Sequence, residues 1–234
     1  LRIGVREALA ELGSALLKSD IPVILHDGED NLGINIAVAD FLANNPYVKV
    51  LLEREYPKTG IAIAPAGVHV LPFPFSYPDT ANNFCHNGIK CLDVAYIAGE
   101  THPERRAVAL SLAYAVQRGE IKNAYIRCNA LSDSASVRVP EDAGWLSWRA
   151  YMEKMGDAEL AVSVRGAGCN TCRHWEAAAA TALLRGRLDI VIPNDFVNGE
   201  TCFEFMEPEN VGVVVSDLLR DKRNIAAVRE NGIT

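Results

Sequence analysis

Apolar residues in the second half of the chain follow two periods in turn. Short continuous apolar runs predict buried strands over residues 91–98, 123–128, 160–164 and 188–192. Apolar residues at intervals of three and four predict helices over 101–119, 145–155 and 207–222, and residues 165–184 combine a glycine-containing turn with an alanine-rich helix. This alternation is typical of an α/β fold, a mostly parallel sheet with helices on both faces.

The first part of the chain alternates in the same way. The pattern predicts helices over 5–18 and 35–44 and strands over 22–26, 48–55 and 68–71. Pro72, Pro74 and Pro78 then stiffen the chain into an extended crossing. We therefore expect a domain boundary there, with a short or truncated N-terminal α/β domain in residues 1–80 and a second domain in 81–234.

Composition excludes several classes of function. The chain has 234 residues, 49% hydrophobic content and a net charge of −7, so it is expected to be globular and to bind neither duplex DNA nor an anionic membrane. We find no apolar run long enough to span a bilayer and no signal peptide. Six cysteines are too few for a disulfide scaffold, which favours a reduced, cytoplasmic protein.

Two local patterns are interpreted as structural. Cys169 and Cys172 form a CxxC, but no second CxxC follows and Arg173 precedes His174, so no metal or haem site is expected. His174 is taken as structural. In the helix at 145–155, the spacing of Trp145, Trp148, Met152 and Met155 predicts a core stripe rather than a cofactor site.

The strongest candidate for chemistry is the stretch RGAGCNTCRHWEAAAATALL at residues 165–184. Gly166 and Gly168 allow backbone to approach a ligand closely, and Asn170 or Thr171 can cap the helix that follows. A helix N-terminus presents unpaired N–H groups and a positive dipole end, and Arg173 adds a cation. This stretch therefore predicts an anion-binding site.

Acidic residues mark a second candidate at the end of the strand at 22–26. The turn Asp27-Gly28-Glu29-Asp30 stands where an open α/β sheet places ligand-contacting groups, so Asp27 could act as a base and Glu29 could contact an acceptor. A solvated acidic turn is the alternative. Asn194 and Asp195 follow the predicted strand at 188–192 and have the same two interpretations, cleft lining or plain turn.

The stretch at 165–184 resembles the nucleotide-sugar-binding segment of glycosyltransferases with the GT-B fold, in which a strand ends at Arg-Gly and a Trp-Glu-Ala helix follows a loop. DVAYIAG with THPERR, LDIVIPNDFVNGETCFEF and EPENV agree with this resemblance, which covers residues 90–234. Residues 1–80 are similar, less specifically, to the end of the N-terminal domain of such proteins. The resemblance implies a Rossmann-like C-terminal domain that binds a UDP- or GDP-linked sugar and an acceptor hydroxyl on a glycan, lipid or protein. It implies no cofactor and no metal.

The same resemblance implies roles for individual residues. Glu176 would bind the donor ribose hydroxyls, and Arg165 and Arg173 would face the diphosphate, with Gly166, Gly168 and Thr171 in the donor-binding loop. Many retaining GT-B enzymes carry a second glutamate eight residues before the ribose-binding one, and this chain has Gly168 there. An inverting enzyme needs a general base on the acceptor side, for which Asp27 and Glu29 are available.

Two other functions remain open from the sequence. One is a non-catalytic nucleotide-binding or regulatory module. The other is a two-cysteine racemase or epimerase, in which thiolates such as Cys85 and Cys172 move a proton on opposite faces of a carbon.

Overall fold

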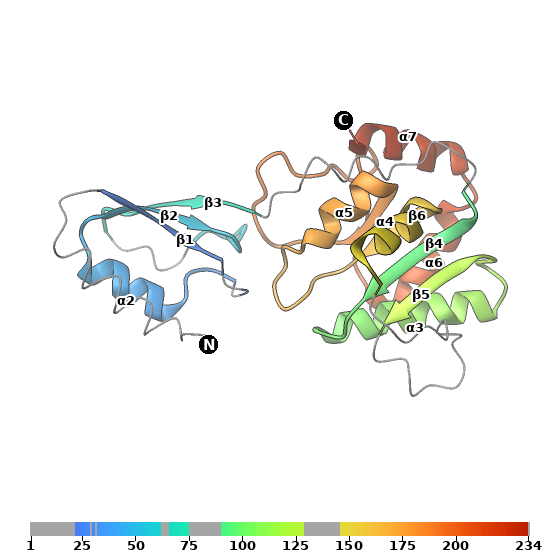
Figure 1. Ribbon diagram of the computed structural model, residues 1–234, viewed down its shortest axis with the longest axis horizontal. Coiled ribbons are helices and arrows are strands. Elements are labelled where there is room, and N and C mark those ends of the chain that lie inside the picture. The colour runs from blue at the N-terminus through green and yellow to red at the C-terminus, as the bar shows by residue number, and fades with distance from the viewer. Residues whose placement is uncertain are drawn as a thin grey trace. The chain divides into compact units, whose positions relative to one another are not determined.

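The computed structural model describes residues 22–28, 30, 32–61, 66–74, 90–128 and 146–233, which fall into two compact units (Figure 1). The first unit comprises Leu1–Phe75 together with Gly168–Asn170 and Asp189–Asp195, and the second comprises Ser76–Ala167, Thr171–Leu188 and Phe196–Thr234. The predicted helix at 5–18, the loop at 129–143 and the predicted boundary at residue 80 lie outside the described residues.

The first unit contains a parallel sheet of three strands in the order β1-β2-β3. The strands are β1 (Val23–Asp27), β2 (Val48–Glu53) and β3 (His69–Pro72). Helix α2 (Ile36–Asn44) connects β1 to β2, and the Asn35 side chain caps it by accepting a hydrogen bond from the N–H of Ala37. The helix buries Val38, Phe41 and Leu42 against one face of the sheet, where they meet Val48 and Leu51.

The second unit contains a parallel sheet of five strands in the order β5-β4-β6-β7-β8. Its strands are β4 (Leu92–Ala98), β5 (Ala124–Cys128), β6 (Ala158–Ser163), β7 (Ala182–Gly186) and β8 (Phe203–Phe205). Its helices are α3 (Pro103–Gln117), α4 (Trp148–Gly156), α5 (Cys172–Ala180), the short 3₁₀ helix η3 (Pro208–Asn210), α6 (Val211–Leu218) and α7 (Lys222–Ile233).

Helices cover both faces of this larger sheet, as the sequence predicts (Figure 1). On one face, Val108 and Leu112 of α3 and Val211 and Val215 of α6 pack against the sheet. On the other face, methionines of α4 and alanines of α5 surround Ala161 and Leu183. The chain goes from β4 outward to β5 and then returns to the other side of β4, so the strand order reverses at β4. Such a switch point leaves a crevice at the carboxyl ends of the strands, where ligands bind in open α/β sheets.

Helices α3 and α6 approach each other closely at Gly212. A Cβ atom built on Gly212 would lie 2.4 Å from the carbonyl oxygen of Ser111 and 2.9 Å from the Cβ of Ala115. The Ser111 hydroxyl accepts a hydrogen bond from the N–H of Gly212 at 2.9 Å and donates one to the carbonyl of Glu209 at 2.6 Å. Glycine is therefore required here for space rather than for backbone freedom.

The sequence prediction was wrong about the strand that follows α5. Residues 188–192 do not form a strand of the sheet, and the pairing strand is β7, whose first residues had been placed in the helix. The helix ends at Ala180 because Thr181 is extended (φ −167°, ψ −168°) and its hydroxyl donates to the carbonyl of Ala158 at 2.7 Å. Two apolar runs lie close together in the sequence here, and periodicity alone does not identify which of them pairs.

Candidate functional site

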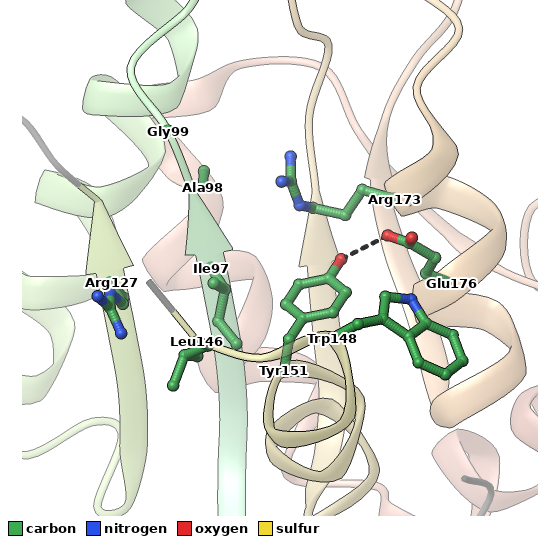
Figure 2. A pocket seen from close by; sticks show the side chains of 9 residues that line it. All are labelled: Ile97, Ala98, Gly99, Arg127, Leu146, Trp148, Tyr151, Arg173 and Glu176. Atoms are coloured by element: carbon green, nitrogen blue, oxygen red, sulfur yellow. Dashed lines mark hydrogen bonds between the residues drawn. The ribbon is translucent and has the colours of Figure 1, made fainter. Parts of the chain in front are cut away.

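A cavity of about 330 Å³ lies at the carboxyl edge of the larger sheet, where the strand order reverses (Figure 2). It is lined by the end of β4, by β5, by α4 with the residue before its N-cap, and by α5. The lining residues are Ile97, Ala98, Gly99, Arg127, Leu146, Trp148, Tyr151, Arg173 and Glu176. A volume of this size is at the lower end of the range for small-molecule pockets.

Helix α5 brings Arg173 and Glu176 into this cavity together. Thr171 is its N-cap, and its hydroxyl oxygen accepts from the N–H of Arg173 at 3.4 Å. Residues three apart share one face of a helix, so the arginine and the glutamate point the same way. His174 and the four alanines at 177–180 of the same helix are buried, and the small alanine side chains let the helix pack close to the sheet. The two charged residues named from sequence are thus neighbours in the cavity.

Helix α4 forms the wall that faces α5. Ser147 caps it by accepting from the N–H of Ala150 at 3.2 Å, and Met152 and Met155 are buried as predicted. The prediction that Trp148 also belongs to the core was wrong, since Trp148 is 43% exposed and lines the cavity. Trp148 lies one helical turn before Met152 and on the same face. Because α4 begins at the edge of the sheet, its first turn faces the cavity rather than the core. Trp145 lies outside the described residues.

The Tyr151 hydroxyl donates a hydrogen bond to Oε2 of Glu176 at 2.8 Å (Figure 2). Burial raises the pKa of Tyr151 and the neighbouring Glu176 carboxylate adds to the effect, while the positive charge of Arg173 opposes it. Tyr151 therefore stays protonated. Nε of Arg173 is buried and has no hydrogen-bond partner among the described residues. The cavity thus combines a cation, a held carboxylate and an exposed indole.

A buried arginine supports the edge of the cavity, and the sequence analysis missed it. Arg105 of α3 is 5% exposed, and its guanidinium donates to the carbonyl of Gly99 and to the carbonyl of Arg165, both at 2.9 Å. Burial lowers the pKa of Arg105, and the positive charge of Arg173 lowers it further. The available signal was spacing, because Arg105 stands on the face of α3 that also carries Val108 and Leu112.

The other residues predicted for the donor site do not line the cavity. Nε of Arg165 is buried without a hydrogen-bond partner among the described residues. A Cβ atom on Gly166 would lie 2.8 Å from Nη2 of Arg105, so this glycine makes room for the arginine. Thr171 acts as the helix cap, the role that the sequence left open between Thr171 and Asn170.

The loop Gly168–Asn170 belongs to the first unit. The Glu55 carboxylate accepts hydrogen bonds from the N–H groups of Cys169 and Asn170 at 2.8 Å and 2.9 Å. A Cβ atom on Gly168 would lie 2.6 Å from Oε1 of Glu55. Two N–H groups of the turn that precedes α5 thus bind a carboxylate of the chain itself.

The first unit gathers carboxylates at the carboxyl edge of its own sheet. Asp27 and Glu53 are register partners at the ends of β1 and β2 and are 6% and 1% exposed. Arg54 forms ion pairs with Asp30 and with Glu55, the latter at 3.6 Å. Glu29 lies outside the described residues, so the structure does not describe that candidate base.

Glu53 is the second functional candidate that the sequence analysis missed. Burial raises its pKa from 4.5 to about 7, and the charge of Asp27 contributes in the same direction. Its Oε1 accepts weakly from the N–H of Glu55 at 3.4 Å, and its Oε2 is buried without a hydrogen-bond partner among the described residues. Its signal in the sequence was position, because it ends a strand adjacent to the one that ends at Asp27.

Several other expectations concern metals, thiols and turns. Within the described ranges, no group of three or more His, Cys, Asp or Glu residues is placed to hold a metal ion. Cys169 is buried and Cys172 is exposed, and Cys85 lies outside the described residues.

Asn194 has the left-handed φ of 55° that suits a turn, and neither it nor Asp195 lines the cavity. None of the helices in the described part of the chain has the length and apolar character needed to cross a membrane.

Sequence comparison identifies no relative, because no protein-family profile and no curated protein sequence matches the chain. Solved structures do match. The pneumococcal O-GlcNAc transferase GtfA, in complex with UDP and GlcNAc, has a TM-score of 0.62 at 10% identity over 97% of this chain and 50% of that one. TarM has a TM-score of 0.55 at 9% identity, over 90% of this chain and 45% of TarM.

The trehalose-6-phosphate synthase OtsA has a TM-score of 0.57 at 10% identity, over 97% of this chain and 71% of that one. The chain thus spans about half the length of GtfA and of TarM. At these identities the likeness establishes the fold rather than the activity. The chain therefore has the fold of the GT-B glycosyltransferases that the stretch at 165–184 resembles.

Proposed function

We propose that the protein transfers a sugar from a nucleoside-diphosphate sugar to a hydroxyl acceptor and that the cavity of the second unit binds the donor. The observation that carries this proposal is the convergence of Arg173, Glu176 and Trp148 in one cavity at the switch point of a doubly wound sheet. Each of the three suits a different part of a nucleotide. GtfA, whose fold this chain shares, was solved with UDP and GlcNAc.

Each of the three side chains is suited to bind a different part of the donor. A carboxylate accepts hydrogen bonds only, so Glu176 suits the two ribose hydroxyls. The planar guanidinium of Arg173 suits the diphosphate, to which it can donate two parallel hydrogen bonds. The partly exposed indole of Trp148 offers a flat apolar face on which any nucleobase can stack. Glu176 and Arg173 act through charge, whereas Trp148 acts through contact area.

The reaction places most of its developing charge on the leaving group. The acceptor oxygen forms a bond to the anomeric carbon, the bond from that carbon to the diphosphate oxygen breaks, and the diphosphate leaves with the electron pair. Arg173 stabilises the negative charge that collects there, which lowers the barrier because the interaction is stronger in the transition state than in the bound substrate. Arg105 supports the neighbouring backbone at Gly99.

The acceptor must also lose its hydroxyl proton. We assign this step to the carboxylates of the first unit, Asp27 and Glu53, of which Glu53 has the pKa suited to a base near neutral pH. The proposed acceptor is a hydroxyl of a glycan, a lipid or a protein, and the proposed leaving group is UDP or GDP.

Isothermal titration calorimetry with UDP, GDP and their sugars tests the donor site. We expect Arg173→Ala and Glu176→Ala each to weaken binding by about 10- to 100-fold, because each removes hydrogen bonds to a charged group. Arg220→Ala and Glu200→Ala are matched controls with exposed side chains, and they should bind as the parent protein does. Failure of the parent to bind any of these ligands would refute the donor site.

Transfer itself needs a second measurement. Release of UDP or GDP from the sugar nucleotide, followed by chromatography with and without candidate acceptors, should be detected for the parent and lost in Arg173→Ala. Binding without any release or transfer would identify the chain as a nucleotide-binding module instead of an enzyme.

A further inference from the structure

The hydrogen bond between Tyr151 and Glu176 concerns how the cavity selects its ligand. The two residues come from different helices, α4 and α5, and both line the cavity (Figure 2). The phenol oxygen lies 2.8 Å from Oε2 of the carboxylate. No other described residue makes a hydrogen bond to Glu176, so Oε1 is left without a protein partner among the described residues. The carboxylate is therefore held at one oxygen and available at the other.

The direction of this hydrogen bond follows from the chemistry of the pair. A tyrosine that stays protonated has one O–H to donate, and burial raises the pKa of Tyr151. An ionised carboxylate can only accept, and its two oxygens offer about four lone-pair sites. Tyr151 occupies one of these sites. The remaining sites suit a ligand that brings two hydroxyl donors close together, such as a vicinal diol.

Packing fixes the phenol in place. Tyr151 packs against a buried cluster that joins α4 to α5 and contains Met152, Met155, Ala177 and Ala178. Because alanine side chains have no rotamers, this contact offers few alternative arrangements. A carboxylate oriented by a fixed hydrogen bond loses little further entropy when a ligand binds, which increases its discrimination between ligands.

We propose that Tyr151 is a positioning residue that makes Glu176 selective for ribose over 2′-deoxyribose in the nucleotide. This inference rests on the proposed function, because it assumes that a nucleotide occupies the cavity. A ribonucleotide places both hydroxyls on the oriented carboxylate. A 2′-deoxynucleotide leaves one acceptor site of the Glu176 carboxylate without its partner beneath the bound sugar, and the loss of this hydrogen bond to a charged group lowers affinity by about tenfold or more.

The decisive variant is Tyr151→Phe, which removes one oxygen atom and keeps the ring. The probes are UDP and GDP with their 2′-deoxy forms, titrated by calorimetry, and the measured quantity is the ratio of the two dissociation constants for the base that binds more tightly. We expect the parent to favour the ribonucleotide by about tenfold and the variant by less than about threefold. Affinity for the 2′-deoxynucleotide should change by less than about twofold.

Two further variants complete the experiment. Tyr114→Phe makes the same chemical change on an exposed tyrosine of α3 and should keep the parent's ratio. Tyr151→Met removes the hydroxyl with a flexible apolar side chain and replaces Tyr151→Phe if that protein does not fold. Thermal unfolding of each variant separates a loss of selectivity from a loss of structure.

The outcomes separate this inference from the proposed function. If the parent binds neither UDP nor GDP, both the proposed function and the role of Tyr151 are refuted. If the parent binds one of these nucleotides and Tyr151→Phe keeps the parent's preference for the ribonucleotide, only the role of Tyr151 is refuted. Equal weakening of both nucleotides in the variant would show that Tyr151 is structural, and tighter binding would show that the phenol competes with the ligand. Either result overturns the inference and leaves donor binding standing.

Discussion

Replacing Glu53 by glutamine should stabilise the first unit and at the same time slow the proposed sugar transfer, for which Glu53 is the proposed base. The ordinary pKa of a glutamic acid is near 4.5, and burial together with the charge of Asp27 raises that of Glu53 to about 7. The folded state therefore holds a proton that the unfolded chain releases. Glutamine has nearly the same shape as protonated glutamic acid but cannot ionise, so Glu53→Gln fixes this side chain in its uncharged form.

The sign and size of the effect follow from proton linkage. Below pH 4.5 the carboxyl is protonated in both states and has no effect on the pH dependence of stability. Between pH 4.5 and about 7 the unfolded chain has lost the proton and the folded one has not, so stability falls as the pH rises through this window. A pKa higher by about 2.5 corresponds to about 3 kcal/mol, fully lost above pH 7. Glu53→Gln should recover most of it at pH 8 and almost none at pH 4.5.

Hydrogen-exchange mass spectrometry between pH 5 and pH 8 measures this locally. Peptides that cover β1 and β2 report on the first unit, and peptides that cover β4 and β6 serve as an internal reference. Glu200→Gln, an exposed glutamate, is the matched control. Asp27→Asn should reduce the effect without abolishing it, because burial is the larger cause of the raised pKa of Glu53 and the charge of Asp27 the smaller one. A parent whose protection in β2 is constant from pH 5 to pH 8 would refute the reasoning.

Three other substitutions test packing, recognition and chemistry. Gly212→Ala should destabilise the second unit by about 1–3 kcal/mol in urea unfolding, because the new Cβ meets α3 backbone, whereas Gly28→Ala, with a contact no closer than 3.7 Å, should cost less than about 1 kcal/mol. Trp148→Ala should weaken nucleotide binding by about tenfold in calorimetry, and an unchanged affinity would exclude stacking. Cys172→Ser should leave sugar transfer unchanged, since only a thiol-based racemase or epimerase needs that sulfur.

Most of the architecture could be predicted because its cause is local. Continuous apolar runs mark the strands that are buried on both faces, and a cap such as Thr171 marks where a helix begins. Arg173 and Glu176 could be paired in advance because residues three apart on one helix share a face whatever the rest of the fold does. The parallel α/β class followed from the alternation alone.

What could not be predicted depends on contacts between distant segments. Glu53 looked like part of a charged strand end, and only its register with Asp27 shows that two carboxyls are buried side by side. Trp148 had the spacing of a core residue, but the helix begins at the edge of the sheet, where the core ends. Residues 182–184 were assigned to the helix because apolar residues after an alanine run fit either structure, and pairing with β6 decides between them.

Arg105 gives the edge of the larger sheet a buried positive charge beside the cavity. A buried guanidinium is costly unless carboxylates surround it, yet among the described residues Arg105 donates only to the carbonyls of Gly99 and Arg165, beside a second cation, Arg173. Tyr96, itself fully buried, donates to the carbonyl of Arg105 and fixes the first turn of α3. The ends of two strands are thus held together by a guanidinium that has no carboxylate partner among the described residues. An edge built this way favours an anionic ligand before any direct contact forms, which is the property that a site for a departing diphosphate requires.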